Sequence, residues 1–517
     1  MKKFKACNQD QLMLLPPSLD ELVPENHLVR IVNGVIDRLN NSILEELFKG
    51  GGAPSYHPKM MLKVIIYGYC SKLYSCRDIA KAIRQDITFM WVSGMQRPDF
   101  NTVNRFRSVY LKPVIEKVFV EVLDFLLQAG YIKFEDYFVD GTKIEASAGK
   151  YTHVWKKNTK RYKKQLKSRV AQLLEEIDEI NDEEERIYGD RDLEELGEES
   201  EINSDQVQEF ANRLDAKLKD VHSKKKYIRL NSRSKKLVKE SEKLLKYEKQ
   251  ERLLGKRNSY SKTDPDATFM RMKNDLLRAG YNILIGTEGQ FILNYSVSQN
   301  AADSTGFTEH LKRTVNRGAS YIPKNCMGDA GIGNEENYVF LDEYDVNNYL
   351  KFNTFHYENT KKAKENKFRR DNFPYDEKKD QFICPAGKRF LYKETVEKKK
   401  KTGYVSELRI YECEDCSNCT YKNQCTRAKG SRKIQISPKL EKYKEQVRLN
   451  LNSEKGISLR KRRGYEVETP FGDWKQNQRF KRFHLRGMAN VDMETGYLSI
   501  AYNLRKIYQK QINKKAA

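Results

Sequence analysis

A long, highly charged stretch interrupts a pattern of alternating strands and helices in the middle of the chain, between residues 156 and 260. Its apolar residues recur at spacings of four and three, break at an acidic segment and then resume, which predicts two antiparallel helices paired as a coiled-coil hairpin. The residues of this pattern are Leu166, Val170, Leu173, Ile177, Ile180, Val207, Phe210, Leu214 and Val221. A spacer or a dimer arm is one interpretation of such a hairpin.

Strand patterns flank this insert and end at acidic residues. Aromatic and apolar residues alternate up to Asp140, and a second strand, in SYIPKNCMGDAG, ends at Asp329. Between them come the strands NILIG and FILNYSV, joined by TEGQ, and a helix that opens near Asp303; a helix NEENYVFLDEY and a strand NYLKF follow. This order is that of the RNase H-like fold with an insert after its first strand. Because sites in such mixed sheets gather at strand ends, we expect Asp140 and Asp329 to approach each other.

Residues 1–130 contain helix patterns and no strand pattern. Ser75 and Asp78 begin one helix, and DFNTVNRFRSVYLK forms a second one that carries Arg105 and Arg107. The pair resembles a helix-turn-helix, whose second helix would enter a groove of DNA. The alternative is a small helical bundle whose arginines face water.

The charge balance favours a polyanionic partner. The 517 residues include 96 Lys and Arg against 72 Asp and Glu, which gives a formal net charge of +24 and a pI of about 9.3. Nucleic acid fits this balance better than an acidic small molecule does, although solubility or attraction to anionic membranes is also compatible with it. The charged insert therefore has a second interpretation, as a basic arm that grips DNA through KSRV, HSKKK and NSRSKK.

The N-terminal residues MKKFKACNQDQLMLLPPSL have no continuous apolar segment and no small-residue cleavage site, so we expect no secretory signal. No stretch reaches the roughly 18 uncharged apolar residues of a membrane span. We expect a cytoplasmic protein with no membrane partner.

A third carboxylate is expected from a helix beside the strand ends. The segment RKRRGYEVETPFGDWKQNQRFKRFHLRG offers Glu466, Glu468 and Asp473. We choose Glu468, because Lys475 follows seven residues later, two helical turns on, so that a carboxylate and an ammonium share one helix face. Pro470 is expected in the first turn of that helix. Basic and aromatic residues around this pair predict a surface for a DNA backbone and splayed bases: Arg463, Arg479, Phe480, Lys481, Arg482, Phe483, His484 and Arg486.

Three converging carboxylates suit metal-dependent phosphodiester chemistry. Two divalent cations activate the nucleophile and stabilise the leaving alkoxide, and hard Mg²⁺ or Mn²⁺ prefers carboxylate oxygens. Without a metal the three carboxylates would repel each other and raise each other's pKa. Spacing alone, however, does not single out these three among the 72 acidic residues.

Longer motifs resemble those of DDE transposases from bacterial insertion sequences. In chain order they are SYHPKMMLKVIIYGYCSKLYSCRDIA, VDGTKIEASAGKYTHVWKK, YSKTDPDATFMRMK, MGDAGIGNEENYVFL and EVETPFGDWKQNQRFKRFHLRGMANVDMETGYLSIAYNLRKIY. By this resemblance Asp140, Asp329 and Glu468 match the catalytic acids, and Lys475 matches the lysine seven positions after the glutamate. Related groups place an arginine four positions before the glutamate; this chain has Gly464 there and Arg463 one position earlier.

The resemblance implies an insertion-sequence transposase that uses two Mg²⁺ or Mn²⁺ ions and acts in the nucleoid. It would bind terminal inverted repeats as a homodimer or a higher oligomer on double-stranded DNA, hydrolyse the phosphodiester at the element's end, and transfer the freed 3′-OH to target DNA. Two alternatives remain open. One is a DNA-binding regulator derived from a transposase, against which the presence of all three acids argues; the other is an RNase H-like nuclease.

A cysteine cluster lies between the second and third acids. Cys413, Cys416, Cys419 and Cys425, with Cys384 upstream, have spacings compatible with tetrahedral Zn²⁺. Similar transposases imply Cys384, Cys416, Cys419 and Cys425 as the ligands, which leaves Cys413 spare. Redox or Fe–S chemistry and unliganded thiols are the alternatives. The run KKKK at 398–401 is expected to form an exposed loop.

We therefore expect an α/β fold, an RNase H-like mixed sheet with a coiled-coil hairpin and a Cys-rich insert, preceded by an all-α N-terminal domain. The predicted boundaries are 1–130 for the helical DNA-binding domain, 131–155, 261–355 and 437–517 for the catalytic domain with Glu468 in its last part, 156–260 for the coiled-coil insert, and 356–436 for the Cys-rich, zinc-binding insert.

Overall fold

The computed structural model describes residues 18–46, 48, 55–188, 202–221, 223–400 and 402–516. The chain divides into two compact units, one comprising Met1–Ile144 with Asn282–Ala517 and the other Glu145–Tyr281, and each is described by itself. Cys7, most of the acidic segment in the charged insert, His222 of HSKKK and Lys401 of KKKK lie outside the described residues. Within the described ranges no helix is long and apolar enough to cross a membrane.

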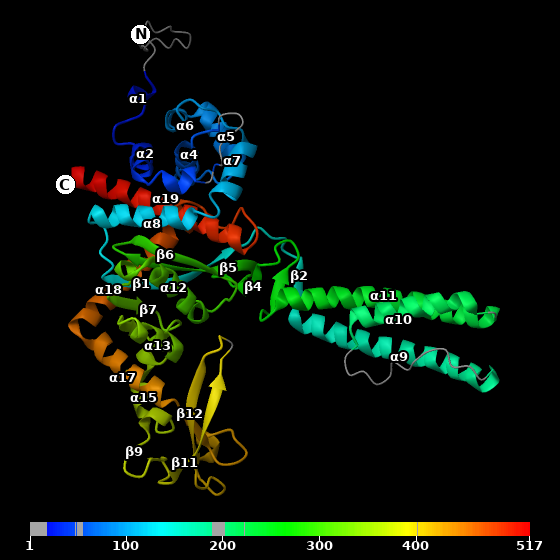
Figure 1. The fold of residues 1–517 in the computed structure, drawn as a ribbon. Coiled ribbons are helices and arrows are strands. Elements are labelled where there is room, and N and C mark those ends of the chain that lie inside the picture. Colours follow the sequence, from blue (N-terminus) through cyan, green and yellow to red (C-terminus); the bar gives the residue numbers. More distant parts are fainter. Residues whose placement is uncertain are drawn as a thin grey trace, which may run out of the picture. The chain divides into compact units, whose positions relative to one another are not determined.

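The first unit begins with short helices, as the sequence predicted (Figure 1). Pro58 occupies the first turn of α4, and the Ser75 side chain accepts the Arg77 backbone N–H at the start of α5. The elements are α1 (Leu19–Leu22), α2 (Leu28–Arg38), α3 (Ser42–Glu45), α4 (Pro58–Cys70), α5 (Cys76–Gln85), α6 (Ile87–Val92), α7 (Phe100–Arg105), a π-helix (Phe106–Tyr110) and α8 (Ile115–Gln128).

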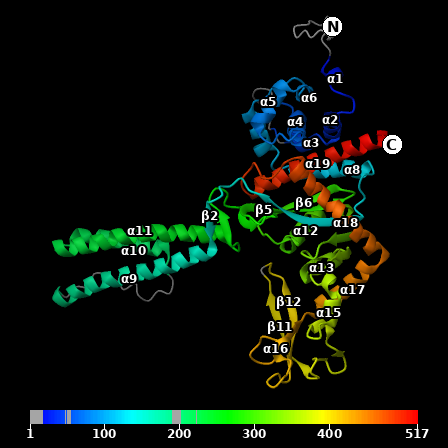
Figure 2. The same cartoon turned by 180° about the vertical axis from the view of Figure 1, so that it is seen from behind.

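The C-terminal helix α19 (Met488–Ala516) packs against α2, α4 and α8, and Figures 1 and 2 both show it beside α8. Buried hydrogen bonds fix this packing: the Tyr69 hydroxyl donates to Glu494 at 3.2 Å, and the Tyr497 hydroxyl donates to the Arg107 carbonyl at 3.0 Å. The N-terminal helices α2, α4 and α8 and the C-terminal helix α19 therefore share one core.

A mixed sheet forms the centre of the first unit. Its strands are β1 (Asp136–Glu145), β5 (Leu277–Glu288), β6 (Phe291–Ser298), β7 (Asn325–Gly328) and β8 (Asn347–Leu350), and β5 begins in the second unit. Pairing runs β5-β1-β7-β8, with β6 on β5; β1, β7 and β8 are parallel, whereas β5 and β6 are antiparallel. Between the strands lie α12 (Phe307–Arg317), α13 (Glu335–Glu343) and 3₁₀ turns at Asp303–Thr305 and Ala319–Tyr321. The predicted order of elements around the sheet is thus present.

One buried carboxylate anchors the entry to β1. Glu288, at the end of β5, accepts the backbone N–H groups of four successive residues at 2.6, 2.8, 2.8 and 3.1 Å. The donors are Lys133, Phe134, Glu135 and Asp136. Each would otherwise be a buried or partly buried donor without a partner, so Glu288 fixes where β1 starts.

Helices α17 (Pro438–Asn452) and α18 (Glu454–Gly472) follow the Cys-rich region, and a π-helix (Asp473–Asn477) continues α18. Ser453 caps the start of α18 by accepting the Gly456 N–H. Pro470 therefore lies near the end of this helix, which corrects the prediction that it stands in the first turn. The proline coincides with the point where the α-helical hydrogen-bond pattern gives way to a π-helix.

The Cys-rich region is an antiparallel sheet in the order β13-β12-β11-β10-β9. Its strands are β9 (Tyr375–Asp376), β10 (Gln381–Ile383), β11 (Arg389–Lys399), β12 (Val405–Cys413) and β13 (Lys433–Ile436), and the short helices here are α14 (Phe355–Glu358), α15 (Lys361–Glu365), a 3₁₀ turn (Arg370–Asn372) and α16 (Lys422–Cys425). Phe373, Phe390, Tyr411 and Ile434 form a small core with Cys413 and Cys416.

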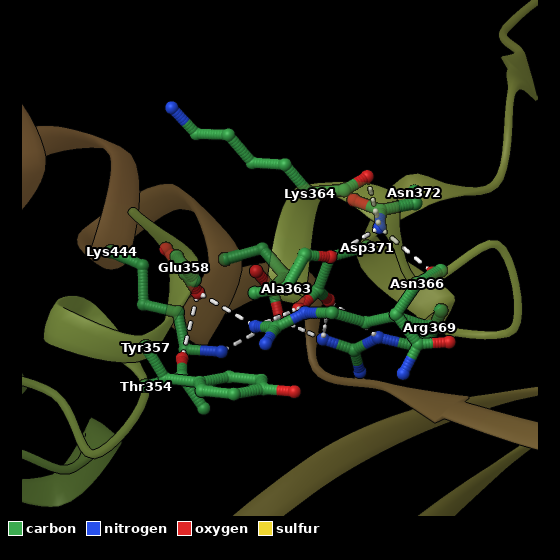
Figure 3. Close-up of polar contacts among 12 residues, drawn as sticks. Thr354, Tyr357, Glu358, Ala363, Lys364, Asn366, Arg369, Asp371, Asn372 and Lys444 are labelled. Carbon is green, nitrogen blue, oxygen red and sulfur yellow. Dashed lines mark hydrogen bonds and ion pairs between the residues drawn. The ribbon is translucent and has the colours of Figure 1, made fainter. Parts of the chain in front are cut away.

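A polar network ties the connection between β8 and this sheet to α17 (Figure 3). Arg369 pairs with Glu358 at 3.3 Å and with Asp371 at 2.6 Å, and Arg448 of α17 reaches the same Glu358 at 3.1 Å. Because several partly buried charges share partners, the network constrains the segment more than one exposed pair would.

The second unit contains three helices where the sequence predicted two: α9 (Lys156–Tyr188), α10 (Ser204–Lys217) and α11 (Lys224–Leu254). Both α9 and α10 pack against α11. The prediction missed that Leu230, Leu237 and Leu244 recur every seven residues and complete the apolar core of the bundle. The unit also contains β2 (His153–Trp155), β3 (Ser259–Ser261), a 3₁₀ turn (Leu218–Asp220) and β4 (Thr268–Arg271), which pairs with the start of β5.

Candidate functional site

Asp140 and Asp329 lie side by side where the parallel pairing of β1 with β7 ends. Asp329 follows β7, but β1 continues to Glu145, which corrects the prediction that this strand ends at Asp140. In the register of β1 and β7, Val139 pairs with Gly328, so the next residue on each strand is one of the two aspartates. Arg463 of α18 lies over both: its Nη2 is 3.3 Å from Asp140 Oδ2 and 3.7 Å from Asp329 Oδ2. One guanidinium thus faces both carboxylates.

Asp303 adds a third acid that the sequence analysis did not select. A Cβ atom at Gly141 would overlap the Asp303 carboxylate, so the missing side chain lets this acid approach the residue after Asp140. Asn282, which is buried, donates to Asp303 Oδ1 at 2.6 Å. In the sequence Asp303 resembled an ordinary helix-start residue, and no local signal joined it to Asp140.

The pKa of Asp140 is raised. Burial is the largest cause, and the negative charges of Asp303 and Asp329 act in the same direction. Arg463 and the Gly141 N–H, which donates to Asp140 at 2.8 Å, lower the pKa without cancelling the rise. Keeping this carboxylate ionised therefore costs free energy in the folded protein, and a cation at the site would repay that cost.

Glu468 is exposed on α18, and among the described residues its side chain forms no hydrogen bond or ion pair. Across all the described residues, the clustered cysteines included, no group of three or more His, Cys, Asp or Glu side chains is placed to hold a metal ion. The structure thus brings two of the three predicted acids together and leaves Glu468 unengaged. Glu466 is instead buried, accepting the Gln290 N–H at 2.7 Å and pairing with Arg462 at 3.3 Å.

Lys475 reaches the part of β1 that follows Asp140. Its ammonium donates to the Thr142 hydroxyl and, at 3.2 Å, to the Lys143 carbonyl. It lies in the π-helix that follows α18, so the simple two-turn spacing from Glu468 does not describe this segment.

Lys351 and Arg460 also face the site and were missed by the sequence analysis. Lys351 follows β8, the strand next to β7, and its side chain is nearly buried. Burial lowers its pKa and Arg463 lowers it further, whereas Asp329 raises it; Arg460 is a further positive neighbour. The only sequence signal was a lysine at the end of a predicted strand.

The other predicted DNA contacts differ in exposure. Arg107 is buried and donates to the Tyr74 carbonyl at 3.0 Å and to Asn104 at 3.3 Å, which corrects its prediction as a groove-facing residue. Arg105, Arg482 and Arg486 are exposed. Phe480 and Phe483 are buried core residues, so they offer no stacking surface in this arrangement.

The five clustered cysteines line one pocket with Phe390 and Arg432. All five are free thiols. Arg432 donates to Cys425 Sγ at 3.0 Å, and burial, then Cys416 and Cys384, raises the pKa of Cys413 to about 12. The sequence cluster is therefore also a cluster in space, with Cys413 in its apolar wall.

Two protein-family models match separate segments of the chain. The family described as transposase DDE domain matches residues 383–508, and the family described as transposase domain (DUF772) matches residues 17–109. Both segments are thus similar to transposase domains. The resemblance to insertion-sequence DDE transposases is confirmed at this level. The DDE match includes Glu468, Lys475 and the five clustered cysteines but neither aspartate. No curated protein and no solved structure matches the chain.

Replacing Asp140 with Asn should stabilise the protein at neutral pH. Because its pKa is raised, the folded state binds this proton more tightly than the unfolded chain, and the free energy of unfolding falls as pH rises above about 3.9. Thermal unfolding from about pH 4 to pH 8 should show an Asp140→Asn advantage that grows with pH.

Asp371→Asn is the matched control of opposite sign. Burial opposes ionisation of Asp371, but Arg369 and Arg370 outweigh it and lower its pKa, so this variant should be less stable than wild type at pH 7. A lower melting temperature of Asp140→Asn at pH 7 would contradict our description of the site.

Proposed function

We propose that this chain is the transposase of an insertion sequence, binding terminal inverted repeats and cleaving DNA by metal-activated hydrolysis before the 3′-OH end is transferred to target DNA. The observation that carries the proposal is the convergence of Asp140 and Asp329 beneath Arg463, where the parallel pairing of β1 with β7 ends. A DDE transposase domain implies nuclease or transposase activity, and transposases act on DNA.

The donor set suits two Mg²⁺ or Mn²⁺ ions. Oxygens of Asp140 and Asp329 already approach one cation, the Arg463 guanidinium, and carboxylate oxygens are the ligands that hard divalent cations prefer. Glu468, whose exposed side chain has no partner among the described residues, is the proposed third ligand. When bound, the metal pair would supply activation of the nucleophile and stabilisation of the leaving 3′-oxygen.

The chain's own residues would position the DNA. Lys475, held beside Asp140 through Thr142 and Lys143, is the proposed contact to a nearby phosphate, and Arg463 would exchange a carboxylate partner for a phosphate. We propose further contacts along double-stranded DNA by the exposed residues Arg105, Arg482 and Arg486. Arg107 is not proposed as a DNA contact, because it is buried. We propose that the active species on DNA is a homodimer or a higher oligomer.

The predicted domains follow from this proposal. Residues 1–130 would bind DNA, 131–155 with 261–355 and 437–517 would form an RNase H-like catalytic domain, and 156–260 would serve as an arm. The order of elements around the mixed sheet supports the RNase H-like assignment.

The first test is Mg²⁺-dependent cleavage of a duplex that carries the element's terminal repeat. Asp140→Asn, Asp329→Asn and Glu468→Gln should each reduce cleavage by at least about a thousandfold while DNA binding persists, because each removes a metal-binding charge and leaves the basic surface intact. Glu466→Gln is the control, since a glutamine can still accept the Gln290 N–H.

The comparison with Glu466 decides which glutamate acts. Loss of cleavage in Glu466→Gln but not in Glu468→Gln would exchange their roles. Equal cleavage of terminal-repeat and random duplexes would favour a nuclease, and binding without any cleavage by the wild-type chain would favour a regulator.

We also propose a structural zinc ion held by Cys384, Cys416, Cys419 and Cys425. Support comes from the shared pocket and from the Arg432 N–H that already donates to Cys425 Sγ, as a thiolate would favour. Such an ion would stabilise a sheet whose core is small.

Metal analysis of reduced, purified protein should find about one zinc per chain. Cys413→Ser should retain the zinc, whereas Cys419→Ser should lose it and melt at a lower temperature. Zinc-free wild-type protein that unfolds at the same temperature with and without added Zn²⁺ would rule the ion out.

A further inference from the structure

Lys351 is a largely buried residue whose ammonium has no hydrogen-bond or ion-pair partner among the described residues. The residue as a whole is 9% exposed. Packing the lysine stem against the sheet reduces the hydration of its unpaired ammonium, and an arriving anion would compensate for that loss.

Its surroundings hold more unpaired positive groups than negative ones. Asp329 is the acid that raises the pKa of Lys351. It lies beyond ion-pair distance of Lys351, and its carboxylate already faces Arg463. The Nε atoms of Arg460 and Arg463 are both buried without a hydrogen-bond partner among the described residues. Arg460 is held over the Phe355 ring at 5.7 Å. Three cationic side chains, Lys351, Arg460 and Arg463, therefore lie near Asp329, and the two arginines each have an N–H donor without a partner among the described residues.

The backbone holds Lys351 firmly in place. Its N–H donates to the Gly328 carbonyl at 3.4 Å, which links the end of β8 to the residue before Asp329. A Cβ at Gly333 would overlap the Lys351 carbonyl, so the loop after Asp329 packs directly on this residue. The lysine is thus positioned by the same strand ends that position the aspartates.

We propose that Lys351 binds a phosphate of the DNA strand in the active site, with Arg460 and Arg463 supplying further donors to the same backbone. This inference rests on the proposed function. A phosphodiester brings a negative charge and several acceptor oxygens, which match an ammonium flanked by two guanidinium groups with free N–H donors. Lys351 is a positioning residue for the strand and takes no part in proton transfer.

The test compares Lys351→Met and Lys351→Arg with wild type in metal-free buffer. Equilibrium binding of a fluorescent terminal-repeat duplex is measured at several salt concentrations, and thermal unfolding is measured without DNA. Lys351→Met should bind about tenfold more weakly, and its dependence of log affinity on log salt should lose about one unit of slope. Its melting temperature should not fall, because the ammonium has no hydrogen bond or ion pair to lose among the described residues. Lys351→Arg should largely restore binding.

Lys324→Met is the matched control. Lys324 is exposed and precedes β7 at the opposite end of the same sheet, so its replacement should change neither the salt slope nor the melting temperature appreciably. Lower stability of Lys351→Met with unchanged affinity and slope would mean a structural role and overturn the inference.

Failure of the inference and failure of the proposed function give different results. Wild-type protein that binds the duplex while Lys351→Met binds it equally well overturns only the role of Lys351. Wild-type protein that binds no DNA overturns the proposed function and this inference together. If Lys351→Met does not fold, Lys351→Gln takes its place, and affinity and slope equal to wild type in that variant overturn the inference.

Discussion

The parallel pairing of β1 with β7 is the constraint on which the candidate site depends. Glu288 accepts four successive backbone N–H groups and so fixes where β1 starts. The register then places Asp140 and Asp329 side by side, each one residue beyond a paired position. A shift of one residue would send alternate side chains to the opposite face of the sheet, so the approach of the two acids follows from backbone geometry.

Bringing like charges together in a partly buried corner has an electrostatic cost. The pKa of Asp140 is raised by burial and by its acidic neighbours, although Arg463 contacts it. Lys351 is a largely buried lysine whose ammonium has no ion pair among the described residues. Metal cations would stabilise the ionised carboxylates, and a DNA phosphate would pair with Lys351. The proposed ligands would therefore stabilise this region of the fold when they bind.

The sequence predicted the parts of the site that depend on local pattern. Strand alternation located Asp140 and Asp329, although β1 continues to Glu145, and the cysteine spacing located residues that line one pocket. It could not find Asp303 or Lys351, because their approach depends on strand pairing between distant segments. Arg107 was assigned to DNA because a basic residue on a helix is usually exposed, whereas here the surrounding core buries it. The third helix of the charged unit was missed because the heptad Leu230, Leu237 and Leu244 was not recognised, and the start of α18 was missed because its cap, Ser453, lies before the segment considered.

The central claim is that Asp140, Asp329 and Glu468 hold the divalent cations of a DNA-cleaving site. Anomalous diffraction from crystals of the chain grown with a terminal-repeat duplex and Mn²⁺ tests it most directly. The account predicts Mn²⁺ peaks in direct contact with carboxylate oxygens of all three residues, with the Arg463 guanidinium moved away from Asp140 and toward a phosphate. Well-occupied Mn²⁺ peaks that contact neither aspartate, or that contact Glu466 in place of Glu468, would contradict it.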